Sequence, residues 1–81
     1  MIEVRFMSLV GKFTTVKTEQ FPTISAAIAT VTTYAEAGGY SNVKLVDDGE
    51  DPDSWRVTAK TPGGRGGRNV AFLDDIGSED Y

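Results

Sequence analysis

Residues 23–39, TISAAIATVTTYAEAGG, contain the helix on which the predicted fold depends. Thr23 can cap its N terminus, with Ser25 as the alternative, because a hydroxyl oxygen accepts an early helical N–H. Gly38 and Gly39 end it, since glycine tolerates the left-handed conformation that follows a last turn. Apolar side chains recur between these ends at the spacing of one helix face: Ile24, Ala27, Ile28, Val31, Tyr34 and Ala35. We therefore expect a helix over residues 24–37.

Strand-like segments lie on both sides of this helix. They show period-two alternation or enrichment in β-branched residues, and they cover residues 2–10, 13–18, 43–46, 55–60 and 70–73. Gly11-Lys12 predicts a hairpin turn between the first two. Phe13 and Val16 differ in parity, so a bulge near this turn is needed to place both on one face.

The order ββαβββ predicts an α+β fold with a mostly antiparallel sheet of four or five strands and one helix packed on one face. We expect a single domain over residues 1–74 and an acidic, flexible tail over residues 75–81. The predicted core comprises Ile2, Val4, Phe6, Ile24, Ile28, Val31, Val43, Leu45, Val57 and Phe72.

Composition excludes several classes of function. The 81 residues include no cysteine and no histidine, which removes disulfides, thiolate and imidazole metal sites, and nucleophiles activated by histidine. No apolar run is long enough for a membrane span, and the alternating N-terminal segment is unlike a secretory signal. We expect a soluble, cytoplasmic protein that is not an enzyme and needs no cofactor.

The segment Thr61-Pro62-Gly63-Gly64-Arg65-Gly66-Gly67-Arg68-Asn69 carries the strongest functional signal. It predicts a long hairpin loop with two arginines among glycines. Such a loop can bind an acidic protein surface, or it can bind nucleic acid because arginine contacts phosphates and stacks on bases. The remaining alternative is a solvated loop without a ligand. Its ending differs from that of a phosphate-binding P-loop.

The net charge of −4 reflects clustered acids, with five between Asp47 and Asp53 and four between Asp74 and Asp80. This balance disfavours general binding to duplex DNA, which requires a broad basic face. The first cluster is predicted to be a solvated turn. The alternatives are a calcium site, whose spacing differs from that of an EF-hand, and an acidic surface that mimics nucleic acid.

Trp55 is the chain's one tryptophan and is either a core residue or a contact beside Arg56. With these two residues, the predicted partner-binding set is Arg65, Arg68, Arg56, Trp55, Gly64 and Gly66.

Two resemblances extend this interpretation. Residues 1–37 resemble the ubiquitin-like β-grasp layout in the Gly11-Lys12 turn of the first hairpin and in the Thr23-Ile24 pair that opens the helix. The whole chain resembles the small α+β accessory proteins of bacteriophages, including anti-CRISPR and other anti-defence inhibitors, with Asp48-Gly49 and Trp55-Arg56-Val57 among the similar features. The second resemblance implies a non-catalytic protein that occupies the surface of a host protein in the host cytoplasm.

The sequence therefore favours a protein-binding module, with small nucleic-acid-binding protein as the alternative. An exposed edge strand also makes a homodimer a further expectation.

Overall fold

A computed structural model describes residues 1–47, 49–64 and 66–77 of the chain. Its elements are β1 (Ile2–Met7), β2 (Thr15–Phe21), α1 (Ile24–Ala37), β3 (Ser41–Asp47), β4 (Ser54–Lys60) and β5 (Gly67–Asp75). The predicted order ββαβββ and the predicted helix are confirmed. The predicted tail falls partly on residues 78–81, which lie outside the described residues.

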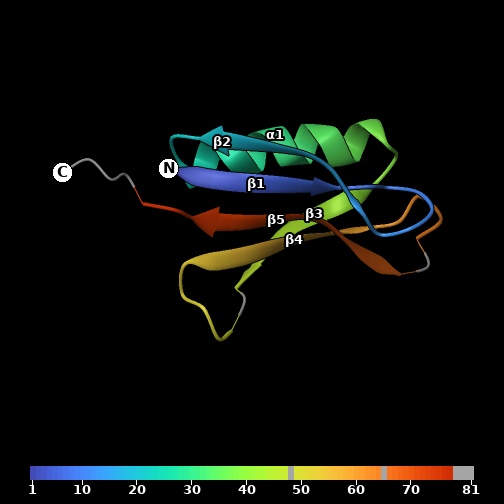
Figure 1. Cartoon of the computed structure of the whole chain (residues 1–81). Helices are drawn as coiled ribbons and strands as arrows, with labels where there is room; N and C mark the ends of the chain where they lie inside the picture. Colours follow the sequence, from blue (N-terminus) through green and yellow to red (C-terminus); the bar gives the residue numbers. More distant parts are fainter. Residues whose placement is uncertain (48, 65, 78–81) are drawn as a thin grey trace.

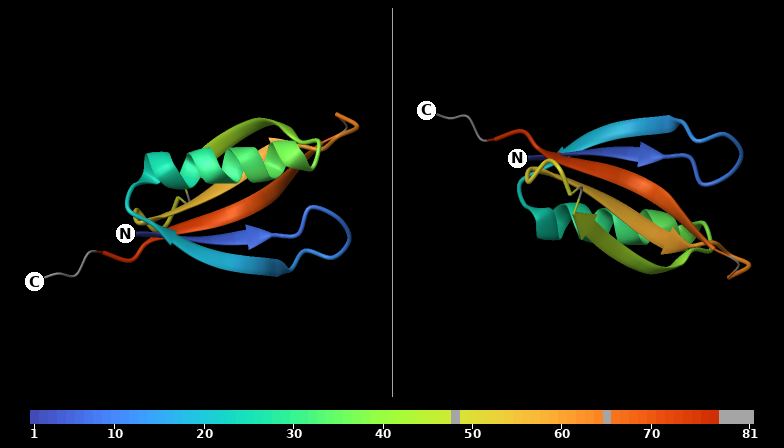
Figure 2. Two further views of the ribbon diagram at one scale, coloured as in Figure 1. Left: turned by 90° about the horizontal axis from the view of Figure 1, so that it is seen from above. Right: turned by 90° about the horizontal axis from the view of Figure 1, so that it is seen from below.

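All five strands form one antiparallel sheet in the order β2-β1-β5-β4-β3 (Figure 1). The first and last strands of the chain are therefore neighbours at its centre, where Val4 lies opposite Leu73. Figure 2 shows α1 crossing one face of the sheet and leaving the opposite face uncovered. We call this uncovered side the open face.

The core lies between α1 and the sheet. Five of the ten predicted core residues are buried, namely Ile2, Val4, Phe6, Val31 and Val57. Three more, Ile24, Ile28 and Val43, are partly buried against them. Tyr40 is also buried in this cluster, next to the end of the helix.

Two core predictions are wrong. Leu45 lies on the edge strand β3 and is 40% exposed. Phe72 lies on the open face, because its neighbours on both sides, Ala71 and Leu73, are buried. Val70 is buried as well, since the register shifts between Val57 and Thr58 and breaks the alternation along β5.

The ends of α1 follow the predicted capping pattern. The Thr23 hydroxyl accepts a hydrogen bond from the Ala26 N–H at 3.1 Å, which satisfies one of the free donors of the first turn. Gly38 is the C-cap, and Gly39 adopts a φ of 88° that favours glycine.

The bulge predicted in the first hairpin is present. Phe6 lies opposite Lys17 but Met7 lies opposite Thr15, so Val16 is an extra residue in β2. The loop between β1 and β2 covers residues 8–14, and we call it the first-hairpin loop. Two tyrosines anchor the start of this loop, because Tyr34 Oη donates to the carbonyl of Met7, the last residue of β1, at 2.6 Å and Tyr40 Oη donates to the Leu9 carbonyl at 2.5 Å.

In the described part of the chain, α1 is not long and apolar enough to cross a membrane, and no other helix is present there.

Candidate binding surface

A row of side chains runs across the open face at right angles to the strands. The register places Thr18 opposite Arg5, Arg5 opposite Phe72, Phe72 opposite Arg56, and Arg56 opposite Val46. Residues that lie opposite each other in a sheet share a face. The row therefore gathers one aromatic ring and two arginines from strands that are far apart in the sequence.

The aromatic and cationic groups of this surface stack on one another. The guanidinium carbon of Arg5 lies 5.5 Å from the centre of the Phe72 ring. Phe13, from the first-hairpin loop, meets Phe72 edge to face with ring centres 6.0 Å apart. The Arg68 guanidinium lies over Phe13 at 5.5 Å. We call Phe13, Phe72, Arg5, Arg56 and Arg68 the arginine–phenylalanine surface.

A shallow hollow of about 160 Å³ lies beside Phe72. It is lined by Arg5, Ser54, Arg56, Phe72 and Asp74, and also touches Trp55 and Leu73. Asp74 closes one side, where its carboxylate accepts hydrogen bonds from Arg5 Nη2 at 3.3 Å and from Ser54 Oγ at 2.7 Å. The hollow thus offers both cationic donors and an anionic acceptor beside an aromatic ring.

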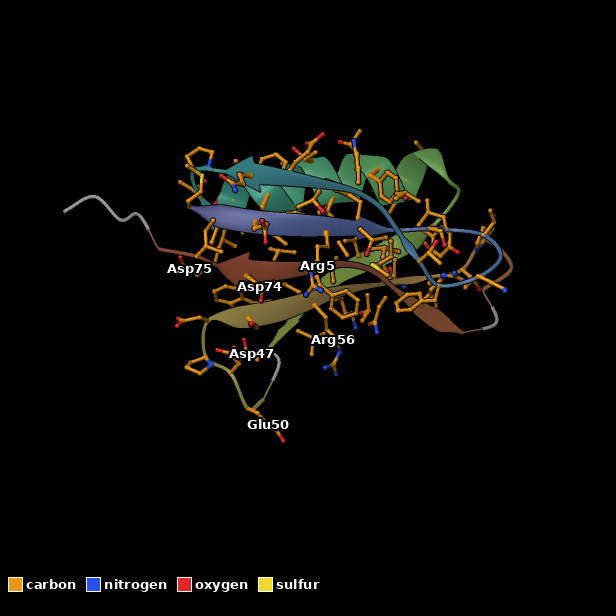
Figure 3. All side chains as sticks on the ribbon, in the orientation of Figure 1. Arg5, Asp47, Glu50, Arg56, Asp74 and Asp75 are labelled. Atoms are coloured by element: carbon orange, nitrogen blue, oxygen red, sulfur yellow. The ribbon has the colours of Figure 1, made fainter. Side chains whose placement is uncertain are left out.

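Arg56 is the second cation that lines this hollow. Among the described residues it makes no side-chain hydrogen bond and no ion pair, whereas Arg5 pairs with Asp74. Figure 3 shows Arg5 and Arg56 near the middle of the sheet, with Asp74 and Asp75 closer to the end where the N terminus lies. A ligand that approaches the open face would therefore meet, at Arg56, a guanidinium that no described residue pairs.

The predicted residues fall in different places. Arg56 lies on the open face, but Trp55 belongs to the helix-covered face, where it lies opposite Leu73 and packs against the core. Adjacent strand residues point to opposite faces, so these two side chains cannot contact one partner surface together. Arg65 lies outside the described residues.

The predicted glycine–arginine loop is shorter than expected, because β5 begins at Gly67 and includes Arg68 and Asn69. Gly64 and Gly66 are exposed in the remaining turn, where Gly64 has a φ of 70°. The Thr61 N–H bonds the Gly66 carbonyl at 2.9 Å, and the Gly64 N–H bonds the Thr61 carbonyl at 2.8 Å.

Arg68 turns toward the first-hairpin loop. Its Nη2 donates to the Gly11 carbonyl at 3.1 Å, and its Nε is buried without a hydrogen-bond partner among the described residues. Part of its donor capacity is therefore used within the protein.

Sequence reasoning missed Arg5, Phe13 and Phe72 as surface residues. The alternation Val4-Arg5-Phe6 already places Arg5 on the face opposite the core, so this signal was present. Its stacking on Phe72 was hidden, because it depends on the pairing of β1 with β5.

The acidic turn between β3 and β4 shows no metal centre in its described part. Across residues 1–47, 49–64 and 66–77, no group of three or more His, Cys, Asp or Glu side chains is arranged to hold a metal ion. The Asp51 carboxylate instead accepts from the Asp53 N–H at 2.9 Å and lies 3.1 Å from Ser54 Oγ, whose one proton it shares with Asp74, and these contacts stabilise the turn.

The fold and this surface define an α+β domain with one helix-covered face and one open face of its sheet. Comparison with protein-family models, curated proteins and solved structures found no match.

Proposed function

We propose that this protein is a non-catalytic binding module that engages another protein through the open face of its sheet. The observation that carries the proposal is the arginine–phenylalanine surface, centred on Phe72 with Arg5 and Arg56 on either side in the same row. A few residues supply most of the binding energy in a protein interface, and arginine and aromatic residues are enriched among them, since aromatic rings bury a large area and arginine makes charge-assisted hydrogen bonds.

Stacking prepares this surface for binding. The ring of Phe72 holds the Arg5 guanidinium, and Phe13 holds that of Arg68, at 5.5 Å in each case. A cation that is already ordered loses less conformational entropy when a partner binds. The partner that fits has an acidic group for Arg56 and apolar side chains against the two phenylalanines.

A protein partner fits this surface better than nucleic acid does. Bases bind single-strand proteins by stacking on free aromatic faces, and here guanidinium groups lie over both rings. The next row of the open face contains Glu3 opposite Asp74, and the protein carries a net charge of −4, so phosphates would be repelled.

The resemblance to bacteriophage accessory proteins suggests which biological role this binding would serve. In that role the module is a stoichiometric inhibitor or regulator that occupies the surface of a host protein in the host cytoplasm. The open face would supply the contact, with the turn between β4 and β5, which contains Gly64 and Gly66, at its margin.

The test compares Arg56→Glu with Lys60→Glu. Both changes reverse one charge on an exposed or partly exposed residue of β4, but only Arg56 belongs to the central row. Each variant and the wild type would be immobilised and exposed to nuclease-treated cytoplasmic extract of the host, with bound proteins identified by mass spectrometry.

We expect one protein to bind the wild type and Lys60→Glu in stoichiometric amount, and Arg56→Glu at least about tenfold more weakly. Equal capture by all three baits would contradict the proposed surface. Failure of the wild type to retain any protein, together with binding of a labelled RNA or single-stranded DNA, would establish the alternative function instead.

A further inference from the structure

We infer that two copies of this chain join edge to edge through β2, in antiparallel, with Thr18 opposite Thr18 of the second copy. The inference concerns a surface distinct from the open face and does not depend on the proposed function.

β2 forms one edge of the sheet. Its residues Thr15 to Gln20 are exposed, and only its inner side pairs with a strand, β1, within the described residues. A strand has backbone donors and acceptors on both sides, so an edge strand presents a row of them to another chain. The two ends of the sheet differ in how well they suit such pairing.

The opposite edge, β3, is distorted. Its register with β4 shifts between Ser41 and Lys44, and Asn42 adopts a φ of 52°. A bulge of this kind bends a strand and interrupts its outward row of backbone groups. β2 also has a bulge, at Val16, but it then pairs without interruption from Lys17 to Phe21, whereas the regular part of β3 covers the shorter segment from Lys44 to Asp47. The β2 edge is therefore the better template.

Symmetry restricts how two β2 strands can pair. A twofold axis normal to the sheet keeps each side chain on its own face of the sheet. Because successive side chains alternate between faces, a residue can lie opposite only a residue an even number of positions away in the sequence. One residue must then lie opposite its own copy. Within the regular segment, the central choices are Lys17, Thr18 and Glu19.

Charge selects one of these three registers. Pairing centred on Lys17 places two ammonium groups opposite each other, and pairing centred on Glu19 does the same with two carboxylates. Pairing centred on Thr18 places each Lys17 opposite the other copy's Glu19. Opposite charges in directly facing positions stabilise a strand pair, and like charges destabilise it.

The two charged side chains are already arranged for this register. Lys17 Nζ and Glu19 Oε2 lie 3.3 Å apart within one chain, on the helix-covered side of β2. In the dimer, the two pairs would form one ring of four alternating charges around the symmetry axis. A small domain also gains stability from such association, because its own core is limited.

The dimer has a consequence for binding. Because the axis is normal to the sheet, both helices lie on one side and both open faces lie on the other. The assembly would therefore present two copies of Phe72 and Arg56 in one direction, which suits a symmetric or repeated partner.

Sedimentation equilibrium of the purified full chain tests the inference. We expect the wild type to be dimeric, and K17E and E19K each to dimerise at least about tenfold more weakly, because each creates like charges opposite each other. K44E, which makes the same change as K17E on the exposed β3 edge, should dimerise like the wild type. Circular dichroism would verify that each variant is folded.

Mixing the two single variants gives the decisive result. The K17E strand carries two acids and the E19K strand two bases, so the mixture restores both opposite pairs and should form a one-to-one heterodimer. A purely structural effect of either substitution would persist in the mixture. A monomeric wild type, or a mixture that stays monomeric while the wild type dimerises, would overturn the proposed pairing.

The experiments on the dimer and on the binding surface can be interpreted separately. R56E should keep the dimer because Arg56 lies on β4, remote from the β2 edge. K17E and E19K should keep the contact surface of each single copy.

Discussion

Arg68 in β5 holds Phe13 of the first-hairpin loop, with its guanidinium 5.5 Å from the centre of the ring. The same side chain donates to the Gly11 carbonyl at 3.1 Å. An arginine predicted to project from a flexible loop therefore connects two distant hairpins. Its direct contact with a partner stays a prediction, whereas its contacts within the protein have measurable consequences.

Replacing Arg68 with alanine should destabilise the first-hairpin loop. The change removes one cation–π contact and one charge-assisted hydrogen bond, and we expect a loss of about 1–2 kcal/mol in the free energy of unfolding. Urea denaturation measures this loss. Hydrogen exchange should also quicken at the Ser8 amide, which bonds the Thr14 carbonyl at 2.7 Å. Arg56→Ala is the control, and an equal loss in both variants would contradict the role of Arg68.

The raised pKa of Tyr34 predicts that the free energy of unfolding depends on pH in the alkaline range. Desolvation by burial raises the pKa of Tyr34, the positive charge of Lys17 acts in the opposite direction, and Tyr40 adds a smaller increase. A folded-state pKa above the unfolded value of about 10 means that the folded protein retains the proton longer. The contribution of Tyr34 to stability is therefore complete below that pH and is lost as the pH rises through the folded pKa.

Tyr34→Phe tests this dependence. Because the hydrogen bond to the Met7 carbonyl is lost, we expect the variant to be less stable by about 1 kcal/mol at neutral pH. The difference from the wild type should then shrink as the pH rises above the unfolded pKa of ~10 and through the higher folded-state pKa of Tyr34. Denaturant unfolding of both proteins at several pH values measures the difference. A constant difference across the alkaline range would contradict the proposed linkage.

The start of α1 offers a matched pair of substitutions. Thr23 accepts the Ala26 N–H, whereas Ser25 lies inside the first turn and makes no such bond among the described residues. Thr23→Ala should lower the free energy of unfolding by about 1 kcal/mol. Ser25→Ala should leave it unchanged or slightly higher, because alanine favours the helix interior. Thermal unfolding would distinguish the two variants. A larger loss for Ser25→Ala would show that Ser25, and not Thr23, caps the helix.

The helix and the order of elements could be predicted because their signals are local. The spacing of Ile24, Ile28 and Val31 reports one helix face without knowledge of any neighbour. The Gly38-Gly39 pair likewise ends the helix through backbone conformation alone. The bulge at Val16 could be inferred since two apolar side chains of opposite parity lie close together in the sequence.

The candidate surface could not be predicted in the same way, because its contacts join strands from opposite ends of the chain. Arg5 stacks on Phe72 only because β1 pairs with β5, a fact that no local pattern contains. In β5, Val70 and Phe72 share a parity in the sequence, but the shifted register buries Val70 with Ala71 and turns Phe72 to the open face. The core prediction was therefore wrong in β5, where it included Phe72 and omitted Val70.

This change of parity gives a direct test of which face of β5 is the core. Leu73 is fully buried opposite Val4, whereas Phe72 is partly buried on the open face. Leu73→Ala should cost about 2–5 kcal/mol, because it removes buried methyl groups and leaves a cavity. Phe72→Ala removes the larger side chain but should cost less, at about 1–2 kcal/mol, since it opens no enclosed space. Denaturant titration of the two variants measures both values, and a greater loss for Phe72→Ala would mean that the sheet presents its other face to the helix.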